Sequence, residues 1–178
     1  LAETRPEWVY VDLGILAAAG VSGGIQPDSD AEQLGQVLRD SGCRLLFVEN
    51  EEQLDKTLLI RDRCPALQRI VIIDMKGLRD FTDPMCVSLA SFVTSGREAS
   101  PVAIAAEQPA VLLVRGGNLQ TLSHGETMSL IADARTKLPL RPNDERLALL
   151  PMSEVMERIL GLYLSLEARV ISNYLENP

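Results

Sequence analysis

Four consecutive residues in the second half of the chain have the composition of an anion-binding loop. Arg115, Gly116, Gly117 and Asn118 follow the apolar run at 111–114. Glycines let backbone amides approach a phosphate and a neighbouring guanidinium adds charge, so this stretch is a candidate anion nest. Gly and Asn also tolerate the positive φ of a tight hairpin turn. A lone glycine pair is a weak signal and a tight turn offers few converging amides, so the sequence favours the plain turn.

The single histidine, His124, is the other residue with obvious chemistry. A general base needs a nucleophile or carboxylate within hydrogen-bond reach. Ser123 precedes it, but neighbours on a strand point to opposite faces, so on a strand the two form no dyad. Asp80 and Asp83 could ligate a cation, although a solvated loop is the simpler interpretation. The sequence therefore predicts no catalytic residue and no metal ligand.

The cysteines and the charge limit the compartment and the partners. Cys43, Cys64 and Cys86 form no CxxC pair, which predicts free thiols in a reducing, cytoplasmic setting. With 25 acidic and 17 basic residues the formal charge is −8, which argues against nucleic acid and anionic membranes as partners. No apolar run reaches the roughly 20 residues that span a bilayer, so no integral membrane segment is expected.

Apolar runs and helical patterns alternate along the chain, and they must position these residues. The expected strands are 44–48, 70–73, 111–114, 146–150 and 170–174. The expected helices open at Pro6, at a capping box of Ser29 with Glu32, at Asn50, and over 89–94, 126–137 and 153–166. Residues 75–87 are expected to be a loop. This alternation predicts an α/β fold, a mainly parallel sheet with helices on both faces.

The 178 residues suffice for one domain or two small ones. Small and weakly patterned residues at 95–109 are typical of a linker. We therefore expect a first α/β subregion at 1–94, a linker at 95–109, and a second α/β subregion at 110–178 that starts at the Arg115–Asn118 stretch.

Four stretches of the chain together have the pattern of a known family. They are Arg5-Pro6-Glu7-Trp8 with Asp12; Leu46-Phe47-Val48-Glu49 with Gln53-Leu54-Asp55-Lys56; Ile72-Ile73-Asp74 with Lys76-Gly77-Leu78-Arg79-Asp80 and Asp83-Pro84; and Leu149-Leu150-Pro151 through Glu157-Arg158 to Leu162-Tyr163-Leu164. These stretches resemble the adenylate-forming (AMP-binding) superfamily, and specifically its long-chain fatty acid–CoA ligase branch. The resemblance covers essentially the whole chain, and the third stretch is the one most specific to the long-chain branch. It implies the fold of part of the large N-terminal domain of these enzymes.

The resemblance also implies a parent reaction. A fatty carboxylate attacks the α-phosphate of ATP to give an acyl-adenylate, and the thiol of coenzyme A then displaces AMP, with Mg as the metal. The family's phosphate loop reads approximately YTSGTTGxPKG, whose glycine amides, hydroxyls and lysine hold the phosphates. Here the flanks remain, including Leu122-Ser123-His124, but the loop is shortened to the Arg115–Asn118 stretch. That stretch is therefore the remnant of the phosphate loop.

Two further positions depart from the family. Glu154 stands where the family commonly has a histidine near the acyl and adenylate site, and a carboxylate there would repel anions. A simpler interpretation is that Ser153 caps a helix and Glu154 complements its dipole. Residues 167–169, Glu-Ala-Arg, replace a small glycine-containing turn.

These departures predict a truncated ligase-like protein, a pseudoenzyme without ligase activity, for which we expect no cofactor. The start at Leu1 without an initiator Met suggests a fragment or a processed chain. The alternative is a non-catalytic interaction module, either a homo-oligomer or a chain whose exposed apolar face is covered by a second chain. A third hypothesis leaves an enzyme role that a separate polypeptide completes.

Overall fold

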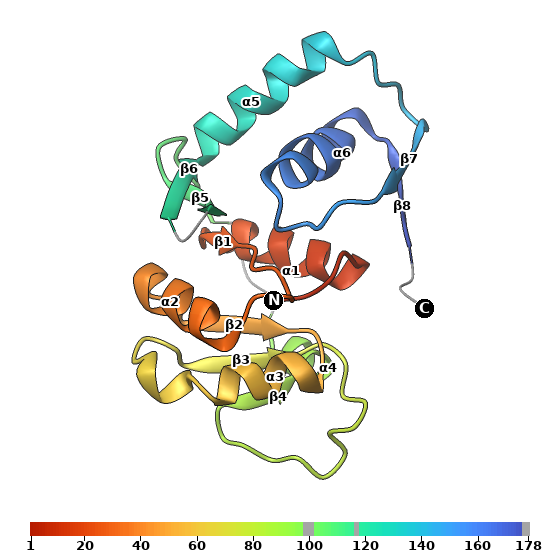
Figure 1. Ribbon diagram of the computed structural model, residues 1–178. Helices are drawn as coiled ribbons and strands as arrows, with labels where there is room; N and C mark the ends of the chain where they lie inside the picture. The colour runs from red at the N-terminus through yellow and green to blue at the C-terminus, as the bar shows by residue number, and fades with distance from the viewer. Residues whose placement is uncertain (98–101, 116–117, 176–178) are drawn as a thin grey trace. The chain divides into compact units, whose positions relative to one another are not determined.

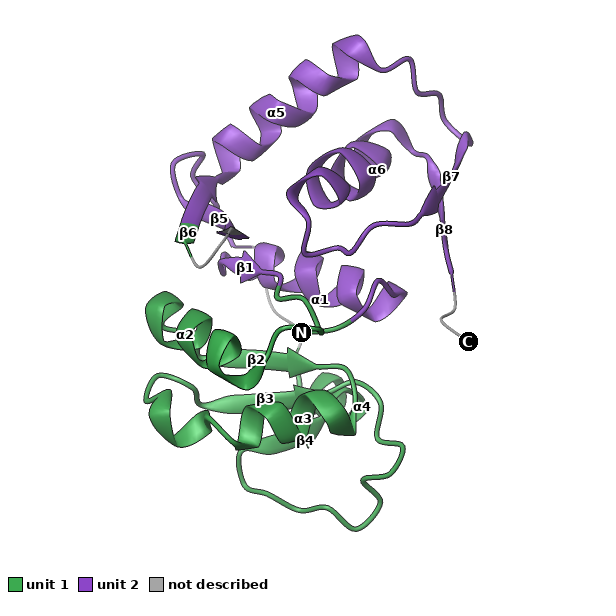
Figure 2. Cartoon of the chain, viewed as in Figure 1, with its two compact units in different colours: residues 1–2, 25–100, 115–119 green, residues 3–24, 101–114, 120–178 purple. Residues whose placement is uncertain are grey.

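The computed structural model describes residues 1–97, 102–115 and 118–175, with the side chain of Arg115 left undescribed. The chain forms an α/β fold (Figure 1). It divides into two compact units that interleave along the sequence (Figure 2). Unit 1 contains residues 1–2, 25–100 and 115–119, and unit 2 contains 3–24, 101–114 and 120–178.

Unit 1 is built on a three-stranded parallel sheet with the order β2-β3-β4. The strands are β2 (Leu45–Val48), β3 (Arg69–Ile72) and β4 (Cys86–Ser88). Val48 lies opposite Ile72 and both are almost fully buried, which explains why the central strand reads as an unbroken apolar run. The strand β4 was not expected, because it falls in the stretch 75–87 that reads as a loop; that part of the expectation was wrong.

Three helices and a 3₁₀ turn surround this sheet. They are α2 (Ala31–Ser41), α3 (Glu51–Leu58), η1 (Arg61–Arg63) and α4 (Leu89–Thr94). Figure 1 shows α3 and α4 on opposite sides of the sheet. The ring of Phe92 in α4 meets the ring of Phe47 edge-on at 5.8 Å.

The ends of these helices follow local side-chain chemistry. The capping box of α2 is formed by Asp30 and Gln33, not by Ser29 and Glu32 as expected. Both pairs have the spacing of a capping box. The helix starts at Ala31, so Asp30 occupies the N-cap position and Ser29 lies one residue outside the helix. Gly42 then ends α2 with φ +62°, a conformation that favours glycine. Asn50 caps α3 as predicted, accepting from the Gln53 amide.

Unit 2 begins with α1 (Pro6–Ala17), which carries proline at its first position as predicted. The two-residue strand β1 (Ser22–Gly23) follows and pairs in parallel with β5 (Pro109–Arg115). The neighbour of β5 on its other side is β6 (Asn118–Ser123), which gives the sheet order β1-β5-β6. The strand β1 was not predicted, since two residues carry no pattern.

The rest of unit 2 contains α5 (His124–Lys137), β7 (Glu145–Ala148), a π-helix η2 (Glu157–Tyr163), α6 (Leu164–Ala168) and β8 (Ile171–Tyr174). Strands β7 and β8 pair in parallel. The helix expected over 153–166 is thus a π-helix followed by a short α-helix. Arg169 ends α6 with φ +60°, in the position where the resemblance implies a glycine-containing turn.

The predicted α/β class is confirmed, with the strands distributed over three small sheets. The pairs β1–β5, β2–β3, β3–β4 and β7–β8 are parallel. The division into 1–94, 95–109 and 110–178 stays a prediction, and residues 98–101 of the expected linker lie outside the described residues. No helix within the described ranges is long and apolar enough to cross a bilayer.

Candidate functional site

The junction between β5 and β6 is where the sequence placed the remnant phosphate loop. Strand β5 ends at Arg115 and β6 begins at Asn118, so only two residues separate the strands. Val111 and Leu113 of β5 are buried. The expectation of two retained strands joined by a short connection is met. Gly116 and Gly117 lie outside the described residues, so the turn and any anion contact there stay a prediction.

The residues that follow β6 form the start of a helix. Ser123 is the N-cap of α5: its hydroxyl accepts from the Glu126 amide at 3.1 Å, and the Glu126 carboxylate accepts from the Ser123 amide at 2.7 Å. The S-x-x-E spacing could have revealed this capping box from sequence. Because the Ser123 hydroxyl is held at the helix end, it is not an activated nucleophile.

His124 is the first residue of α5, rather than a strand residue as considered from sequence. Its backbone amide donates to the carbonyl of Gln108 at 2.9 Å. Its Nε2 is buried and, within the described part of the chain, has no hydrogen-bond partner. From sequence we expect a structural or surface role for His124, and a buried ring nitrogen without a hydrogen-bond partner gives no support to a role as general base.

Glu154 lies in a turn just before the helical segment and is exposed. Its amide donates to the Pro151 carbonyl and its carbonyl accepts from the Arg158 amide, each at 2.9 Å. The hydroxyl of Ser153 is buried without a partner among the described residues, so the expectation that Ser153 caps the helix is wrong. The approach of Gly24 explains this burial: a Cβ on Gly24 would lie 2.7 Å from Ser153 Cα.

Thr4 holds the same turn from the other end of the sequence. Its hydroxyl donates to the Leu150 carbonyl at 2.9 Å and accepts from the Met152 amide at 3.1 Å. Met152 is nearly fully buried, so the segment before Glu154 is fixed on both sides. This contact could not be predicted from sequence, since Thr4 lies 148 residues from Met152.

A buried ionic network occupies the centre of unit 2. The Arg158 guanidinium pairs with Asp12, and both side chains are only 1% exposed. Arg158 Nε donates to the Tyr163 hydroxyl at 2.9 Å, and that hydroxyl donates to Asp12 Oδ2 at 2.7 Å. Ser22 completes the group by donating to Asp12 Oδ1. A buried charge pair is tolerated only when its remaining donors and acceptors are satisfied, as they are here.

Two aromatic rings enclose this network. The Arg158 guanidinium carbon lies 5.3 Å from the Trp8 ring centroid and 5.8 Å from that of Tyr163. Burial is the main cause that raises the pKa of the Tyr163 hydroxyl above its ordinary value, so the group stays protonated and can donate. Sequence reasoning quoted Asp12, Arg158 and Tyr163 only as parts of the resemblance and assigned them no contact.

A second ion pair, between Arg146 of β7 and Glu157 of the π-helix, lies under Gly161. A Cβ on Gly161 would come within 2.6 Å of a Glu157 carboxylate oxygen, so a larger residue here would have to displace the ion pair. Glu157 and Arg158 are consecutive, so both ion pairs hold the start of the π-helix. The cluster is a scaffold for η2, because each charged side chain in it has an ionic partner in the chain; Arg146 Nη1 is buried and has no hydrogen-bond partner among the described residues.

Comparison with known proteins identifies the scaffold. Residues 1–176 match the family described as AMP-binding enzyme. The chain belongs to that family. Its sequence is 28% identical over 166 residues to the long-chain-fatty-acid–CoA ligase FadD15 of Mycobacterium bovis, covering 89% of this chain and 28% of that protein. The predicted resemblance to long-chain fatty acid–CoA ligases is therefore confirmed, and the chain spans less than a third of that relative's length.

Solved structures share the fold. The anthranilate CoA ligase AuaEII, solved with anthranoyl-AMP, superimposes with a TM-score of 0.85 at 20% identity, covering 100% of this chain and 34% of that chain. The fatty acyl CoA synthetase of Mycobacterium tuberculosis gives a TM-score of 0.80 at 17% identity, covering 97% of this chain and 33% of that chain. The AMP-binding family chain described here thus has the architecture of the acyl-CoA ligases over its whole length.

That the β5–β6 connection does not fit the phosphates of ATP stays a prediction, because Gly116 and Gly117 lie outside the described residues. A phosphate cradle needs several converging amides and a cation, and the strands that would flank it are separated by two residues. For magnesium, the described residues contain no group of three or more His, Cys, Asp or Glu side chains that could hold a metal ion.

Proposed function

We propose that this chain is a non-catalytic member of the AMP-binding family, a ligase-like pseudoenzyme that keeps the scaffold and does not activate a fatty acid. The observation that carries the proposal is the two-residue separation of β5 and β6. The parent reaction, activation of a fatty acid through an acyl-adenylate to acyl-CoA, concentrates negative charge on transferred phosphates. Preorganised donors must stabilise that charge, and this connection offers few of them.

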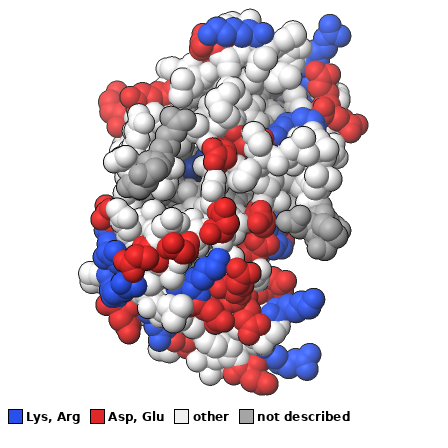
Figure 3. Space-filling view, in the orientation of Figure 1, with Lys and Arg blue, Asp and Glu red and all other residues white. Residues whose placement is uncertain are grey.

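The electrostatics of the chain support the same proposal. The formal charge is −8, and Glu154 is an exposed carboxylate. On the face drawn in Figure 3, acidic side chains are spread over the surface with basic ones among them. The basic side chains on that face form no continuous patch. Such a surface neither attracts a nucleotide triphosphate nor compensates locally for a lost phosphate loop.

ATP–pyrophosphate exchange tests the proposal directly. The purified chain, incubated with palmitate, ATP and Mg, should catalyse no exchange above a heat-inactivated sample, whereas FadD15 run in parallel should exchange. Calorimetry with ATP and AMP should show no saturable heat. Exchange or saturable nucleotide binding by the chain alone would overturn the proposal. The same assay with an added candidate partner tests whether a second polypeptide completes the site.

A second candidate function is self-association through the β7–β8 sheet. Leu147 of β7 and Ile171 of β8 lie on one face of this sheet and are each 48% exposed, although parallel sheets are normally covered on both faces. Leu149 and Leu150 extend the apolar surface. We propose a second copy as the occupant, because an isologous interface can place these exposed apolar side chains against those of a symmetry mate. Glu145 and Asn173 lie on the same face, and the Asn173 amide donates to the Glu145 carboxylate.

Light scattering separates this candidate from a monomer. A dimer that Leu147→Asp dissociates, while Leu130→Asp on the exposed side of α5 leaves it intact, would support it. A monomer at all concentrations would remove it.

We also propose a cytoplasmic location, supported by the absence of disulfides among Cys43, Cys64 and Cys86. Fractionation of cells that express the tagged protein tests this, and recovery in an oxidising compartment would contradict it.

A further inference from the structure

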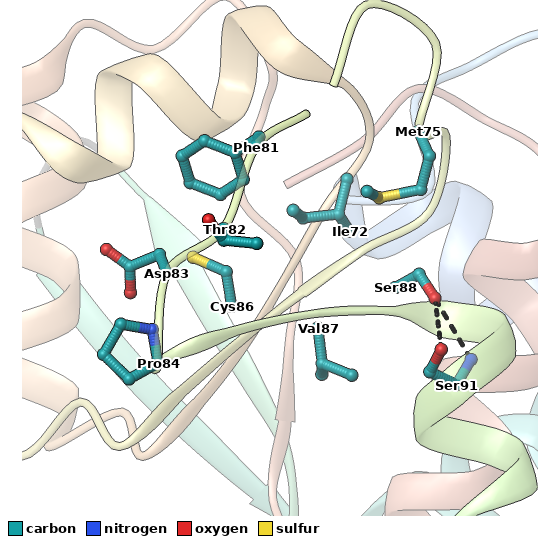
Figure 4. A pocket seen from close by; sticks show the side chains of 10 residues that line it. All are labelled: Ile72, Met75, Phe81, Thr82, Asp83, Pro84, Cys86, Val87, Ser88 and Ser91. Carbon is teal, nitrogen blue, oxygen red and sulfur yellow. Dashed lines mark hydrogen bonds between the residues drawn. The ribbon is translucent and has the colours of Figure 1, made fainter. Parts of the chain in front are cut away.

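Unit 1 contains a pocket of about 640 Å³ beside the edge strand β4, separate from the β5–β6 junction. Its lining residues come from the end of β3, the segment that leads to β4, β4 itself and the first turn of α4. Figure 4 shows Met75, Phe81 and Thr82 across from Cys86 and Ser88. The volume falls within the range of small-molecule sites, about 300–1,000 Å³. The segment belongs to the stretch that most specifically resembles the long-chain branch.

The segment that forms one wall of this pocket is held in place by its own contacts. Asp83 pairs with Arg61 of η1 at 2.5 Å, and its other oxygen accepts from the Met85 amide at 2.8 Å. Earlier in the segment, the Leu78 amide donates to the Met75 carbonyl, and the Leu78 side chain is buried. The wall is therefore preformed, and a ligand need not order it.

The lining is mainly apolar with small neutral donors. Ile72, Met75, Phe81, Pro84 and Val87 supply the apolar part. Ser88 donates its hydroxyl proton to Ser91 Oγ at 2.9 Å, which leaves the proton of Ser91 for another acceptor. Among the described residues, none accepts that proton. The Ser91 hydroxyl is thus positioned at the pocket to donate to an oxygen of a ligand.

The charges at the pocket disfavour an anionic ligand. Asp83 is the only charged lining residue among those described, and Arg61 already neutralises it. Burial, followed by the Asp83 charge, raises the pKa of Cys86 to about 11, so this thiol is neutral near pH 7. A carboxylate or phosphate would find no cation in the lining, while an uncharged oxygen would find a hydroxyl donor.

We infer that this pocket binds an uncharged aliphatic molecule that carries a hydroxyl oxygen, such as a fatty alcohol. The aliphatic chain contacts Met75, Phe81 and Val87, and the oxygen accepts from Ser91. This ligand class differs from the carboxylate that fatty acid ligases activate, and the inference does not rest on whether the chain lacks ligase activity.

Nuclear magnetic resonance titration of the nitrogen-labelled full chain with decanol tests the inference. The amides of residues 86–91 should shift saturably, and decanoate at pH 7.4 should bind at least about tenfold more weakly. Ser91→Phe fills the pocket from an exposed helix position and should weaken decanol binding by about tenfold or more. Ala90→Phe, on the same helix but outside the lining, is the matched control and should bind like the parent chain.

Several outcomes would overturn the inference. They are the absence of saturable shifts with decanol, equal binding of decanoate, and unchanged decanol affinity in Ser91→Phe. If Ser91→Phe fails to fold, Ser91→Ala replaces it: the loss of the donor should weaken decanol several-fold and leave decane unaffected. If Ser91→Ala weakened the binding of decanol and decane equally, or changed the binding of neither, the role given to Ser91 would be contradicted.

Discussion

Two arginine–aspartate pairs hold the two units in different ways. In unit 2, Arg158 and Asp12 are both 1% exposed and lie 146 residues apart in sequence. In unit 1, Arg61 and Asp83 are 29% and 14% exposed and lie 22 residues apart. The first pair fixes the interior of a unit, and the second fixes a surface segment beside a pocket. The energetic role of an ion pair thus depends on its burial, not on its residue types.

The strongest way to break this comparison is Arg158→Ala. It leaves the buried Asp12 carboxylate without its cation, which should lower the free energy of unfolding by about 3–5 kcal/mol. Urea denaturation measures the loss. The control is Arg135→Ala, which removes the exposed pair with Glu167 and should cost less than about 1 kcal/mol. Similar losses in the two variants would contradict the importance of burial.

Gly161→Ala tests how tightly the π-helix packs against the Arg146–Glu157 ion pair. The added Cβ would press on the Glu157 carboxylate that Arg146 holds, so the free energy of unfolding should fall by about 1–3 kcal/mol. Gly14→Ala is the matched control. An added Cβ at Gly14, an exposed helix position, has no atom within 4 Å, so stability should rise by up to about 1 kcal/mol. A neutral Gly161→Ala would show that the ion pair can move aside.

Arg61→Ala should have a smaller effect on unfolding, below about 1 kcal/mol, because its pair is partly exposed. Its effect should instead be local. Hydrogen exchange should speed up at the Met85 and Cys86 amides, which bond to Asp83, and stay unchanged in β2. A large global loss with no local change would remove the distinction between the two pairs.

The effect confined to the narrowest range of conditions is a pH dependence at Cys86, which is absent near neutral pH. Its pKa is raised from 9.0 to about 11, so between these values the folded chain holds a proton that the unfolded chain releases. Stability should therefore fall as pH rises through this window, and Cys86→Ser should flatten that slope. Chemical denaturation at pH 8.5, 10 and 11 measures it. An identical slope in Cys86→Ser would show that the thiol is not buried as described.

Much of the fold could be predicted because it rests on local patterns. Apolar runs identified β2, β3 and β5, and Asn50 marked the start of α3. Where two capping residues were adjacent, at Ser29 and Asp30, the sequence could not decide the register. The strand β1 was missed because two residues carry no periodicity. The π-helix was missed because its backbone hydrogen bonds join residues five apart instead of four, a difference that leaves no mark on residue composition.

Of the candidate site, sequence comparison with the family predicted only the short connection between β5 and β6. The shortened connection could be seen by comparison with the family loop, since insertions and deletions are visible in sequence. The contacts of Asp12 with Arg158 and of Thr4 with Met152 could not be predicted, because a single sequence holds no information on which distant residues meet. The pocket beside β4 could not be predicted for the same reason. Its walls depend on the path of the segment between β3 and β4, which are neighbours in the same sheet.

The Asp12–Arg158 pair also sets an order for synthesis. Asp12 leaves the ribosome 146 residues before its partner, a delay of about 7–30 s at common translation speeds. Residues 25–97, by contrast, contain all strands of the β2-β3-β4 sheet. The β2-β3-β4 sheet can therefore form during synthesis before the π-helix emerges, while the Asp12 carboxylate still lacks the arginine that neutralises it.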